Sequence, residues 1–412
     1  MYSLLSGMRV VEGAAFVAAP TCCLHLQQMG AEVIRFDTIG GGPDFRRWPR
    51  AKGSVGGASL YWEGLNKGKK SIAIDLGRPE GRELATLIAT APGDGGGIFV
   101  TNYPVTGFLS HEKLKARRAD MITVRVMGWA DGSNAVDYTV NSALGVPMMT
   151  GPDKLGDEPV NNVLPAWDFA TGNYAAFVTL AAERHRSRHN EGLEVRVPLG
   201  DIAMATLGNL GQVAEVALSG ADRPRYGNDI FGAFGRDYKT ADGRRLMIVG
   251  LTQRHWRDLV TALGIGDEVQ RLETELDLDL SKDEGLRFQH RDRLNPIIAA
   301  VIERKSAAEW ARVFSGTGVC WSDYNSLKEA ISDPRLFMGA ESIFEPVTHG
   351  SGETYLTPGS AATIVDLTRE MPGRAPCLGE HTEEVLASVL GLSSGAIAHL
   401  HDEGVVASSA TA

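Results

Sequence analysis

The segment MRVVEGAAFVAAPTCCLHLQQMGAEVIRF, residues 8–36, decides the fold of this 412-residue chain. A short apolar strand is predicted at Met8–Glu12, and Pro20 suits the first turn of the helix that follows. Gly30 ends this helix, and Ala31–Phe36 forms the next strand. A strand, a helix and a strand at this spacing predict a βαβ unit with parallel strands and a right-handed crossover.

The same alternation continues through the first half of the chain. It predicts strands at Ser71–Leu76, Gly97–Tyr103 and Asp120–Gly128, and a helix at Pro79–Thr90. Repeated strand and helix units build a parallel sheet that is covered by helices. The predicted fold class is therefore α/β. A change of character near Pro224–Tyr238, where a turn-rich segment precedes the strand LMIVGL, predicts the start of a second domain.

Composition excludes several classes of protein. The formal net charge of -10 and the lack of a long basic run argue against nucleic acid as a partner. The apolar stretches are too short to cross a bilayer and no secretory signal is evident, which predicts a cytoplasmic protein without a membrane partner. No metal site is predicted, because no CxxC spacing occurs among the four cysteines, Cys22, Cys23, Cys320 and Cys377.

The stretch LPAWDFATGNYAAFVTLAAERHR, residues 164–186, carries the main candidate for chemistry. Asp168 is expected just ahead of a long amphipathic helix that starts near Gly172, where the helix dipole and free amide groups favour an ionised carboxylate. An ionised aspartate can attack an acyl group. The alternative is a plain helix cap. The apolar neighbours Trp167 and Phe169 favour the nucleophile, since a plain cap is usually solvated.

Binding of a nicotinamide cofactor is disfavoured. Gly13 follows the first strand, but it lacks the second and third glycines with which such a turn approaches a pyrophosphate. The glycine-rich segments IGGGPD and GDGGG lack the lysine and the serine or threonine of a phosphate-binding loop, and they are interpreted as flexible connections.

Six segments in this order resemble those of the class III CoA-transferase family, also called CaiB/BaiF. They are GMRVVEGAAFVAAP (7–20), EVIRFD (32–37), LNKGKKSIAIDLGRPEG (65–81), FVTNYP (99–104), WDFATG (167–172) and LGEHTEEVLASVLGL (378–392). The resemblance implies a large Rossmann-like domain built from both chain ends, a smaller α+β middle domain, and an interlocked homodimer.

The domain boundaries implied by the resemblance follow the changes in the sequence. The large domain would occupy residues 1–205 and return at 357–412, and the small domain would span 225–331. Residues 206–224 and 332–356 would be the linkers between them.

The resemblance also implies a reaction in which Asp168 is the nucleophile. Asp168 would attack the thioester of an acyl-CoA to give a mixed anhydride and CoA thiolate, which would then form an aspartyl-CoA thioester. Splitting one acyl exchange into two lowers each barrier. No cofactor is expected beyond the CoA moiety of the substrate.

The segments VDYTVN, NNVLPAWD and RPRYGNDIFGAFGRDY are similar to those of family members that move CoA within one diacid. They imply conversion of 2-methylfumaryl-CoA (mesaconyl-C1-CoA) to 3-methylfumaryl-CoA (mesaconyl-C4-CoA). One alternative is an intermolecular CoA transferase between dicarboxylates such as succinyl-CoA and malate or citramalate. Another is a non-catalytic acyl-CoA-binding protein.

Two groups of binding residues are expected. The CoA-binding candidates, two of which follow the glycine loop and three of which match family positions, are Arg46, Arg47, Ile74, Arg78 and Asn102. The candidates for the substrate pocket are Phe16, Val17, Trp167 and Arg236. Each arginine has the alternative of a surface charge, and Arg236 that of pairing with a structural carboxylate such as Asp237.

Departures from the family pattern limit the chemistry. Val17 and Met127 stand where members of the oxalate pathway carry glutamine and lysine, which argues against formyl-CoA:oxalate exchange. The racemase branch has a histidine where this chain has Val136, so the base for proton transfer at an α-carbon is missing. Asp137 is expected to be structural, with orientation of the substrate together with Tyr138 as the alternative.

Overall fold

The computed structural model describes residues 1–53, 58–339 and 341–409. The chain divides into two compact units: unit 1 contains residues 1–144, 162–218 and 334–412, and unit 2 contains residues 145–161 and 219–333. Residues 145–161, which fall inside the predicted large domain, thus group with unit 2. The boundaries of the predicted domains stay a prediction.

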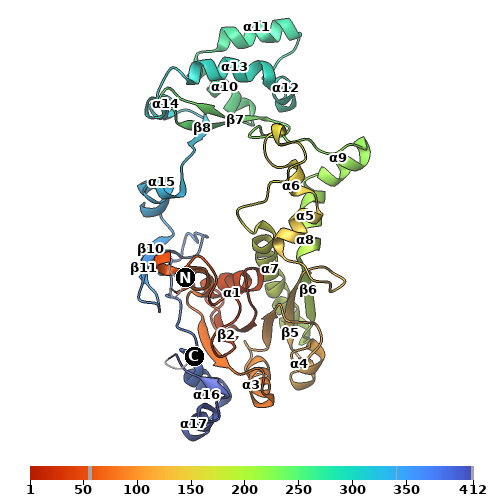
Figure 1. The fold of residues 1–412 in the computed structure, drawn as a ribbon, viewed down its shortest axis with the longest axis vertical. Coiled ribbons are helices and arrows are strands. Elements are labelled where there is room, and N and C mark those ends of the chain that lie inside the picture. Colours follow the sequence, from red (N-terminus) through yellow and green to blue (C-terminus); the bar gives the residue numbers. More distant parts are fainter. Residues whose placement is uncertain (54–57, 340, 410–412) are drawn as a thin grey trace. The chain divides into compact units, whose positions relative to one another are not determined.

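Unit 1 is built around a seven-stranded sheet with the order β12-β3-β2-β1-β4-β5-β6 (Figure 1). Strand β12 pairs antiparallel with β3, and the other neighbours are parallel. The strands are β1 (Arg9–Gly13), β2 (Glu32–Asp37), β3 (Lys70–Ile74), β4 (Ile98–Thr101), β5 (Ile122–Met127), β6 (Glu194–Pro198) and β12 (Val406–Ala407). The order β3-β2-β1-β4-β5-β6 is that of a Rossmann sheet, which confirms the predicted fold class.

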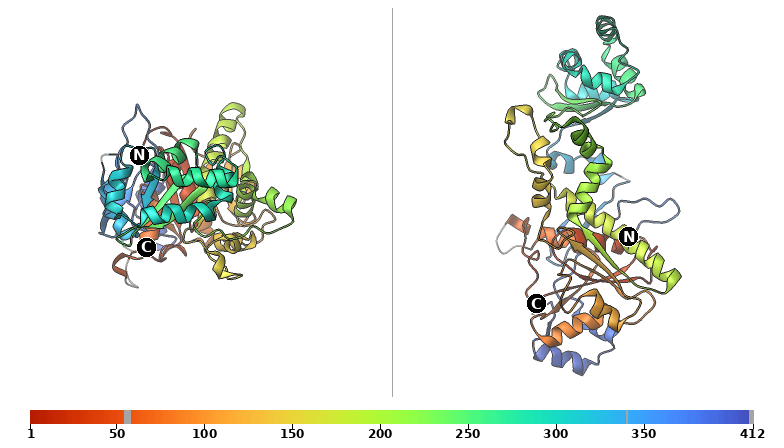
Figure 2. Two further views of the ribbon diagram at one scale, coloured as in Figure 1. Left: turned by 90° about the horizontal axis from the view of Figure 1, so that it is seen from above. Right: turned by 90° about the vertical axis from the view of Figure 1, so that its right-hand side faces the viewer.

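Helices cover this sheet on both faces (Figure 2). Helices α1 and α7 pack against each other on one face, whereas α3 and α16 pack against each other beside β3. The helices of unit 1 are α1 (Ala18–Gln28), α2 (Leu60–Asn66), α3 (Pro79–Ala89), α4 (His111–Arg117), α5 (Asp137–Ala143), α7 (Ala166–His189), α8 (Leu199–Asn209), α9 (Gln212–Ser219), α16 (Thr382–Leu390) and α17 (Ser394–Asp402). Much of the predicted linker 206–224 is therefore helical.

The C-terminal part of the chain is bonded to the N-terminal part of the same sheet. Thr382 at the start of α16 accepts the amide hydrogen of Ala73 at 3.1 Å. The hairpin of β10 (Phe344–Thr348) and β11 (Thr354–Pro358) contacts α2, because the Tyr355 hydroxyl donates to Glu63 at 2.8 Å. The large α/β unit is thus built from both chain ends, as the resemblance implies.

Two glycines allow close packing beneath the site. A Cβ atom on Gly13 would lie 2.5 Å from the ring of Phe36 and 3.0 Å from that of Phe99. A Cβ on Gly172 would lie 2.7 Å from the carbonyl oxygen of Ala18, so α7 can lie directly on α1. Gly13 therefore serves the packing of the strands, in keeping with the missing dinucleotide fingerprint.

The predicted start of the long helix is wrong. Helix α7 begins at Ala166, after Pro165, so Asp168 lies in its first turn and not ahead of it. Helix formation this early is possible because the first amide groups find an acceptor elsewhere in the fold, the carboxylate of Asp137.

Unit 2 is an α+β unit with its own core. A three-stranded antiparallel sheet, β7-β8-β9, packs with helices through buried residues that include Trp256 and Trp310. The elements of unit 2 are α6 (Val146–Met149), β7 (Phe234–Lys239), β8 (Arg245–Gly250), α10 (Gln253–Leu263), α11 (Gly266–Leu276), α12 (Glu284–Gln289), α13 (Arg291–Ile302), α14 (Ala307–Phe314), β9 (Cys320–Asp323) and α15 (Leu327–Ile331). This matches the predicted α+β character of the second domain.

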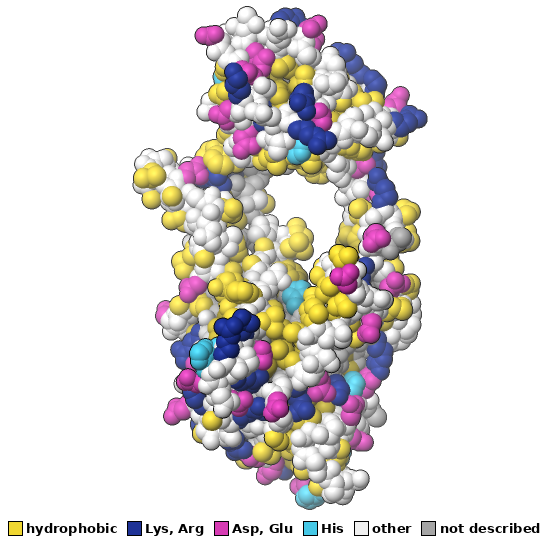
Figure 3. All heavy atoms as spheres, turned by 180° about the vertical axis from the view of Figure 1, so that it is seen from behind, with side chains coloured by type: hydrophobic (Ala, Val, Ile, Leu, Met, Phe, Trp, Pro, Cys, Tyr) yellow, Lys and Arg dark blue, Asp and Glu magenta, His cyan; other side chains and the backbone are white. Residues whose placement is uncertain are grey.

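The surface of the described residues carries charges of both signs. On the face shown in Figure 3, Lys and Arg side chains are interspersed with Asp and Glu. No helix in residues 1–53, 58–339 or 341–409 is both long enough and apolar enough to cross a membrane. The same residues contain no group of three or more His, Cys, Asp or Glu side chains arranged to hold a metal ion.

Candidate active site

The site lies where β1 and β4 end side by side, at the switch point of the Rossmann order. Ligands of such sheets bind outside the carboxyl ends of the strands at this point. Asn102, directly after β4, fixes the loop after β1: its Nδ2 donates to the Ala15 carbonyl at 2.9 Å, and its Oδ1 accepts the Ala15 amide hydrogen at 3.2 Å. This predicted CoA-binding residue therefore shapes the loop.

The loop after β1 is held in an unusual backbone conformation at Phe16. Phe16 has φ of 69°, which is rare for a residue with a side chain and costs on the order of 1–3 kcal/mol. Its amide donates to Oδ2 of Asp44 at 3.2 Å, which stabilises this conformation. The Phe16 ring is 40% exposed, whereas Val17 is buried at the start of α1. Of these two predicted pocket residues, Phe16 is the accessible one.

Arg47 is held between aromatic rings. Its guanidinium carbon lies 5.7 Å from the centre of the Phe16 ring and 5.3 Å from that of Tyr61, at the start of α2. Both distances are within the range of cation–π attraction. No carboxylate in the described residues forms an ion pair with Arg47. The neighbouring Arg46 is exposed.

Asp168 is half-buried in the first turn of α7. Burial, and then the negative charge of Asp137, raise the pKa of Asp168 to about 7, while the charge of Arg47 opposes this rise. Burial also raises the pKa of Tyr61, on which the charges of Arg47 and Asp168 act. The predicted nucleophile, Arg47 and Tyr61 are therefore within electrostatic reach of one another.

A different carboxylate caps α7. Oδ2 of Asp137, the first residue of α5, accepts the amide hydrogens of Trp167 at 2.7 Å and of Asp168 at 3.0 Å. The buried Trp167 also donates its indole N–H to Oδ1 of Asn141 at 3.0 Å. Asp168 therefore does not cap the helix. Among the described residues, its carboxylate receives no hydrogen bond.

Ile74 and Arg78 lie around the end of β3. Ile74 is fully buried in the core and pairs with Val406 of β12. Arg78 precedes α3 and lies 3.7 Å from Glu80 and 3.8 Å from Glu403, with its side chain 36% exposed. Arg78 is accessible to a ligand, whereas the side chain of Ile74 is covered by protein. Their contacts with CoA stay a prediction.

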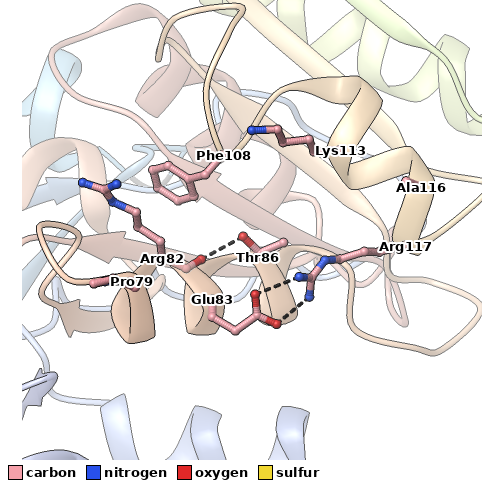
Figure 4. Close-up of a pocket in the computed structure, with 8 residues that line it drawn as sticks. All are labelled: Pro79, Arg82, Glu83, Thr86, Phe108, Lys113, Ala116 and Arg117. Carbon is pink, nitrogen blue, oxygen red and sulfur yellow. Dashed lines mark hydrogen bonds and ion pairs between the residues drawn. The ribbon is translucent and has the colours of Figure 1, made fainter.

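A pocket of about 430 Å³ opens between α3 and α4, and Pro79, the residue after Arg78, lies in its lining (Figure 4). Arg82 lies 5.7 Å from the centre of the Phe108 ring, and Glu83 accepts two hydrogen bonds from Arg117, at 2.6 and 2.7 Å. Lys113 also lines the pocket. The pocket contains none of the residues around Asp168, so it is a separate part of the surface that suits an anionic, aromatic group.

Arg236 lies in unit 2, on β7. Its guanidinium is 3.3 Å from Oδ2 of Asp229, so the structural carboxylate that it pairs with is Asp229. Asp237 pairs with Arg245. The contribution of Arg236 to a substrate pocket stays a prediction.

The sequence of the chain was compared with known protein families. Residues 5–382 match the family model described as CoA-transferase family III. The chain belongs to this family. Membership of this family implies an acyl-CoA substrate.

Individual relatives of this CoA-transferase cover its full length. The chain is 46% identical over 407 residues to 2-methylfumaryl-CoA isomerase of Chloroflexus aurantiacus, covering 99% of this chain and 98% of the relative. It is 28% identical to succinyl-CoA--D-citramalate CoA-transferase of the same organism, covering 98% of each chain. A CaiB/BaiF family protein from Brucella suis has the same fold, with a TM-score of 0.73, 22% identity, and coverage of 94% of this chain and 100% of that one.

Sequence reasoning missed several residues of the site. Tyr61 and Asp44 carry no recognisable signal, because each becomes relevant only when α2 and the loop after β2 fold over the end of β1. The sequence predicts a structural role for Asp137 but not its partners, because its two hydrogen bonds to α7 join residues 30 and 31 positions apart. A carboxylate that begins a short helix is too common to indicate such a partner.

Proposed function

We propose that this CoA-transferase moves CoA from the C1 to the C4 carboxylate of mesaconate, converting 2-methylfumaryl-CoA to 3-methylfumaryl-CoA. The observation that carries the proposal is the full-length identity of 46% with a 2-methylfumaryl-CoA isomerase. The half-buried Asp168, whose carboxylate is free of hydrogen bonds from the described residues, supports it because the reaction needs an accessible carboxylate nucleophile.

In the first step, an oxygen of Asp168 attacks the thioester carbonyl. A carbon–oxygen bond forms, the carbon–sulfur bond breaks, and CoA leaves as a thiolate with the bonding electron pair. The thiolate then attacks the aspartyl carbonyl of the mixed anhydride, which leaves an aspartyl-CoA thioester and free mesaconate. The diacid turns, and its other carboxylate repeats the two steps in reverse, so that Asp168 is regenerated.

The pKa of Asp168, about 7, suits this role. A weakly solvated carboxylate of raised pKa is more basic, and therefore more nucleophilic, than an exposed aspartate, yet it is substantially ionised near neutral pH. Rates should rise as Asp168 loses its proton.

We assign Arg47 to the free carboxylate of the diacid. The sequence suggested a CoA phosphate as its partner, but the whole pantetheine arm separates those phosphates from the reacting thioester. Arg47 acts on the nucleophile itself, and no carboxylate of the described residues occupies its guanidinium. A guanidinium in such a position binds a carboxylate through charge-assisted hydrogen bonds.

We assign the phosphates and adenine of CoA to the pocket between α3 and α4. Arg82 and Lys113 supply positive charge there, and Phe108 supplies an aromatic surface. Arg78 is close enough in sequence to add a further cation. The prediction of a cytoplasmic enzyme with no cofactor beyond CoA remains part of this proposal.

We further propose a homodimer with interlocked subunits. Large apolar side chains are exposed along α7 to α9, and a second copy of the chain would bury them: Tyr174 (49%), Phe177 (63%), Leu210 (67%) and Leu218 (88%). Light scattering on dilution should then give a dimer, and a folded, active monomer would contradict this.

The decisive experiment is incubation of the purified protein with mesaconyl-C1-CoA, followed by chromatography of the CoA esters. The C4 ester should accumulate. Labelled free mesaconate, added during the reaction, should stay out of the ester pool. Rapid incorporation of label, or efficient use of succinate as acceptor, would favour the intermolecular dicarboxylate transferase. Binding without any turnover would favour the acyl-CoA-binding protein.

A further inference from the structure

Asp137 is a second carboxylate at the Asp168 site, and the mechanism above does not use it. The residue is 2% exposed and begins α5. One of its oxygens, Oδ2, accepts the amide hydrogens of both Trp167 and Asp168, at 2.7 and 3.0 Å. The backbone of the nucleophile is therefore held directly by this carboxylate.

The other oxygen of Asp137, Oδ1, is buried and has no hydrogen-bond partner among the described residues. No ion pair to Asp137 occurs in this part of the chain either. Burial raises the pKa of Asp137, and the two amide groups oppose that rise. When Asp137 is ionised, its charge is therefore not neutralised by a cation and acts on the neighbouring Asp168.

We propose that Asp137 is a positioning residue for the nucleophile. It fixes the first turn of α7 so that Asp168 faces the acyl group, and its negative charge opposes the ionisation of Asp168. The inference rests on the proposed function, since it assumes that Asp168 is acylated during turnover. It goes beyond a structural cap, because a cap requires only a hydrogen-bond acceptor and not a charge.

Few other charges face this pair. Arg47, from the loop after β2, is the cation that acts on Asp168, and it opposes the effect of Asp137. Tyr61 on α2 is a further titratable group beside Asp168, and Asp44 in the loop after β2 and Tyr138 on α5 also act on it. Asp44 is paired with Arg35, so Asp137 is the carboxylate placed to act on Asp168.

Two variants separate positioning from charge. Asp137→Asn retains an oxygen that can accept the two amide hydrogens but removes the charge, whereas Asp137→Ala removes both. Asp131→Asn is the matched control: Asp131 accepts a backbone amide hydrogen at 2.8 Å in the same way, but in an exposed loop. The rate of mesaconyl-C1-CoA isomerisation would be measured across roughly pH 5–9 for each protein.

The wild-type rate should rise through the pKa of Asp168. In Asp137→Asn this rise should move to lower pH by roughly one unit, because a like charge has been removed. Asp137→Ala should lose turnover by roughly 100-fold with a nearly unchanged KM, since the nucleophile is misplaced. Thermal unfolding would be measured in parallel, to show whether each variant folds. If Asp137→Ala does not fold, the pH profile of Asp137→Asn alone tests the role of the charge.

An unshifted pH profile in Asp137→Asn, with or without a loss of stability, would reduce Asp137 to a structural cap and overturn the inference. A shift of equal size in Asp131→Asn would overturn it as well. Failure of the proposed function is recognised separately, because in that case the wild-type protein itself would not isomerise the substrate.

Discussion

Two groups of buried or half-buried carboxylates lie at the same edge of the sheet, and they differ in whether a cation pairs with them. Glu12, Asp37 and Asp44 surround Arg35, at 3.0, 2.8 and 3.2 Å respectively, and all four side chains are at most 4% exposed. Lys69 adds a second cation, 2.7 Å from Glu12. Asp137 and Asp168, by contrast, have no cation bonded to them in the described residues.

The difference in ion pairing corresponds to a difference in role between the two groups of carboxylates. The cations of the Arg35 cluster hold its carboxylates in place through ion pairs, and Asp44 in turn fixes the loop after β1 by accepting the amide hydrogen of Phe16. The Asp137 and Asp168 pair has no such ion pairs in the described residues, and burial, followed by the charge of Asp137, raises the pKa of Asp168 to about 7. The Arg35 cluster therefore supports the fold, whereas the half-buried Asp168 has no ion pair in the described residues.

The largest expected effect comes from substituting Asp168, the half-buried carboxylate without an ion pair. Asp168→Asn should lower turnover by at least roughly 1,000-fold while the fold is retained, because an amide cannot form the anhydride. Asp168→Glu should be nearly as poor, since the attacking oxygen moves by about one bond length. Chromatography of the CoA esters measures both, and hydroxylamine trapping during turnover should mark Asp168 alone. Wild-type activity in either variant would refute the assignment.

The substitution Arg35→Met tests how much the ion pairs of the Arg35 cluster contribute to stability. Removing this cation leaves buried carboxylates uncompensated, so the free energy of unfolding should fall by about 3–5 kcal/mol. The matched control is Arg9→Met, because Arg9 pairs with Glu32 at 3.0 Å on adjacent strands but is 27% exposed. The control should cost less than about 1 kcal/mol in denaturant titrations. Equal losses in the two variants would show that burial of the pair makes no difference.

In the proposed function, Arg47 is the cation that binds the free carboxylate of the substrate. Arg47→Met should lower kcat/KM for mesaconyl-C1-CoA by roughly 10–100-fold, the value of charge-assisted hydrogen bonds. Acylation of Asp168 by an acyl-CoA without a free carboxylate, followed by mass spectrometry, should be little affected. Equal losses with both substrates would instead assign Arg47 to CoA, as the sequence suggested.

The smallest expected effect is a gain of stability. The pKa of Asp168 is about 7 in the folded protein and about 4 when unfolded, so ionisation destabilises the folded state as the pH rises between these values. Asp168→Asn removes this penalty. It should be more stable than wild type by on the order of 1–2 kcal/mol above pH 7, after allowance for partial solvation, and equally stable near pH 4. Urea unfolding at the two pH values measures this difference in stability. A gain that persists at the lower pH would show that ionisation of Asp168 is not its cause.

Local patterns in the sequence were sufficient for the framework of the fold. The strands β1 to β5 and the helix α3 lie where apolar runs, Pro79 and the glycine punctuation predict them, because strand and helix periodicity are short-range properties. Asp168 was singled out for the same reason, from its apolar neighbours and the helix that follows. The start of α7 was misplaced, since the group that caps it is not local.

The sequence by itself therefore determined the α/β class and the family, and it singled out Asp168, within a short motif, as the candidate nucleophile. Only the tertiary structure decided which carboxylates are compensated: Asp44 lies beside Arg35, and Asp137 lies against the amide of Asp168. The physical reason is that charge compensation depends on distance and burial, and both are set by segments that meet only after the sheet has formed.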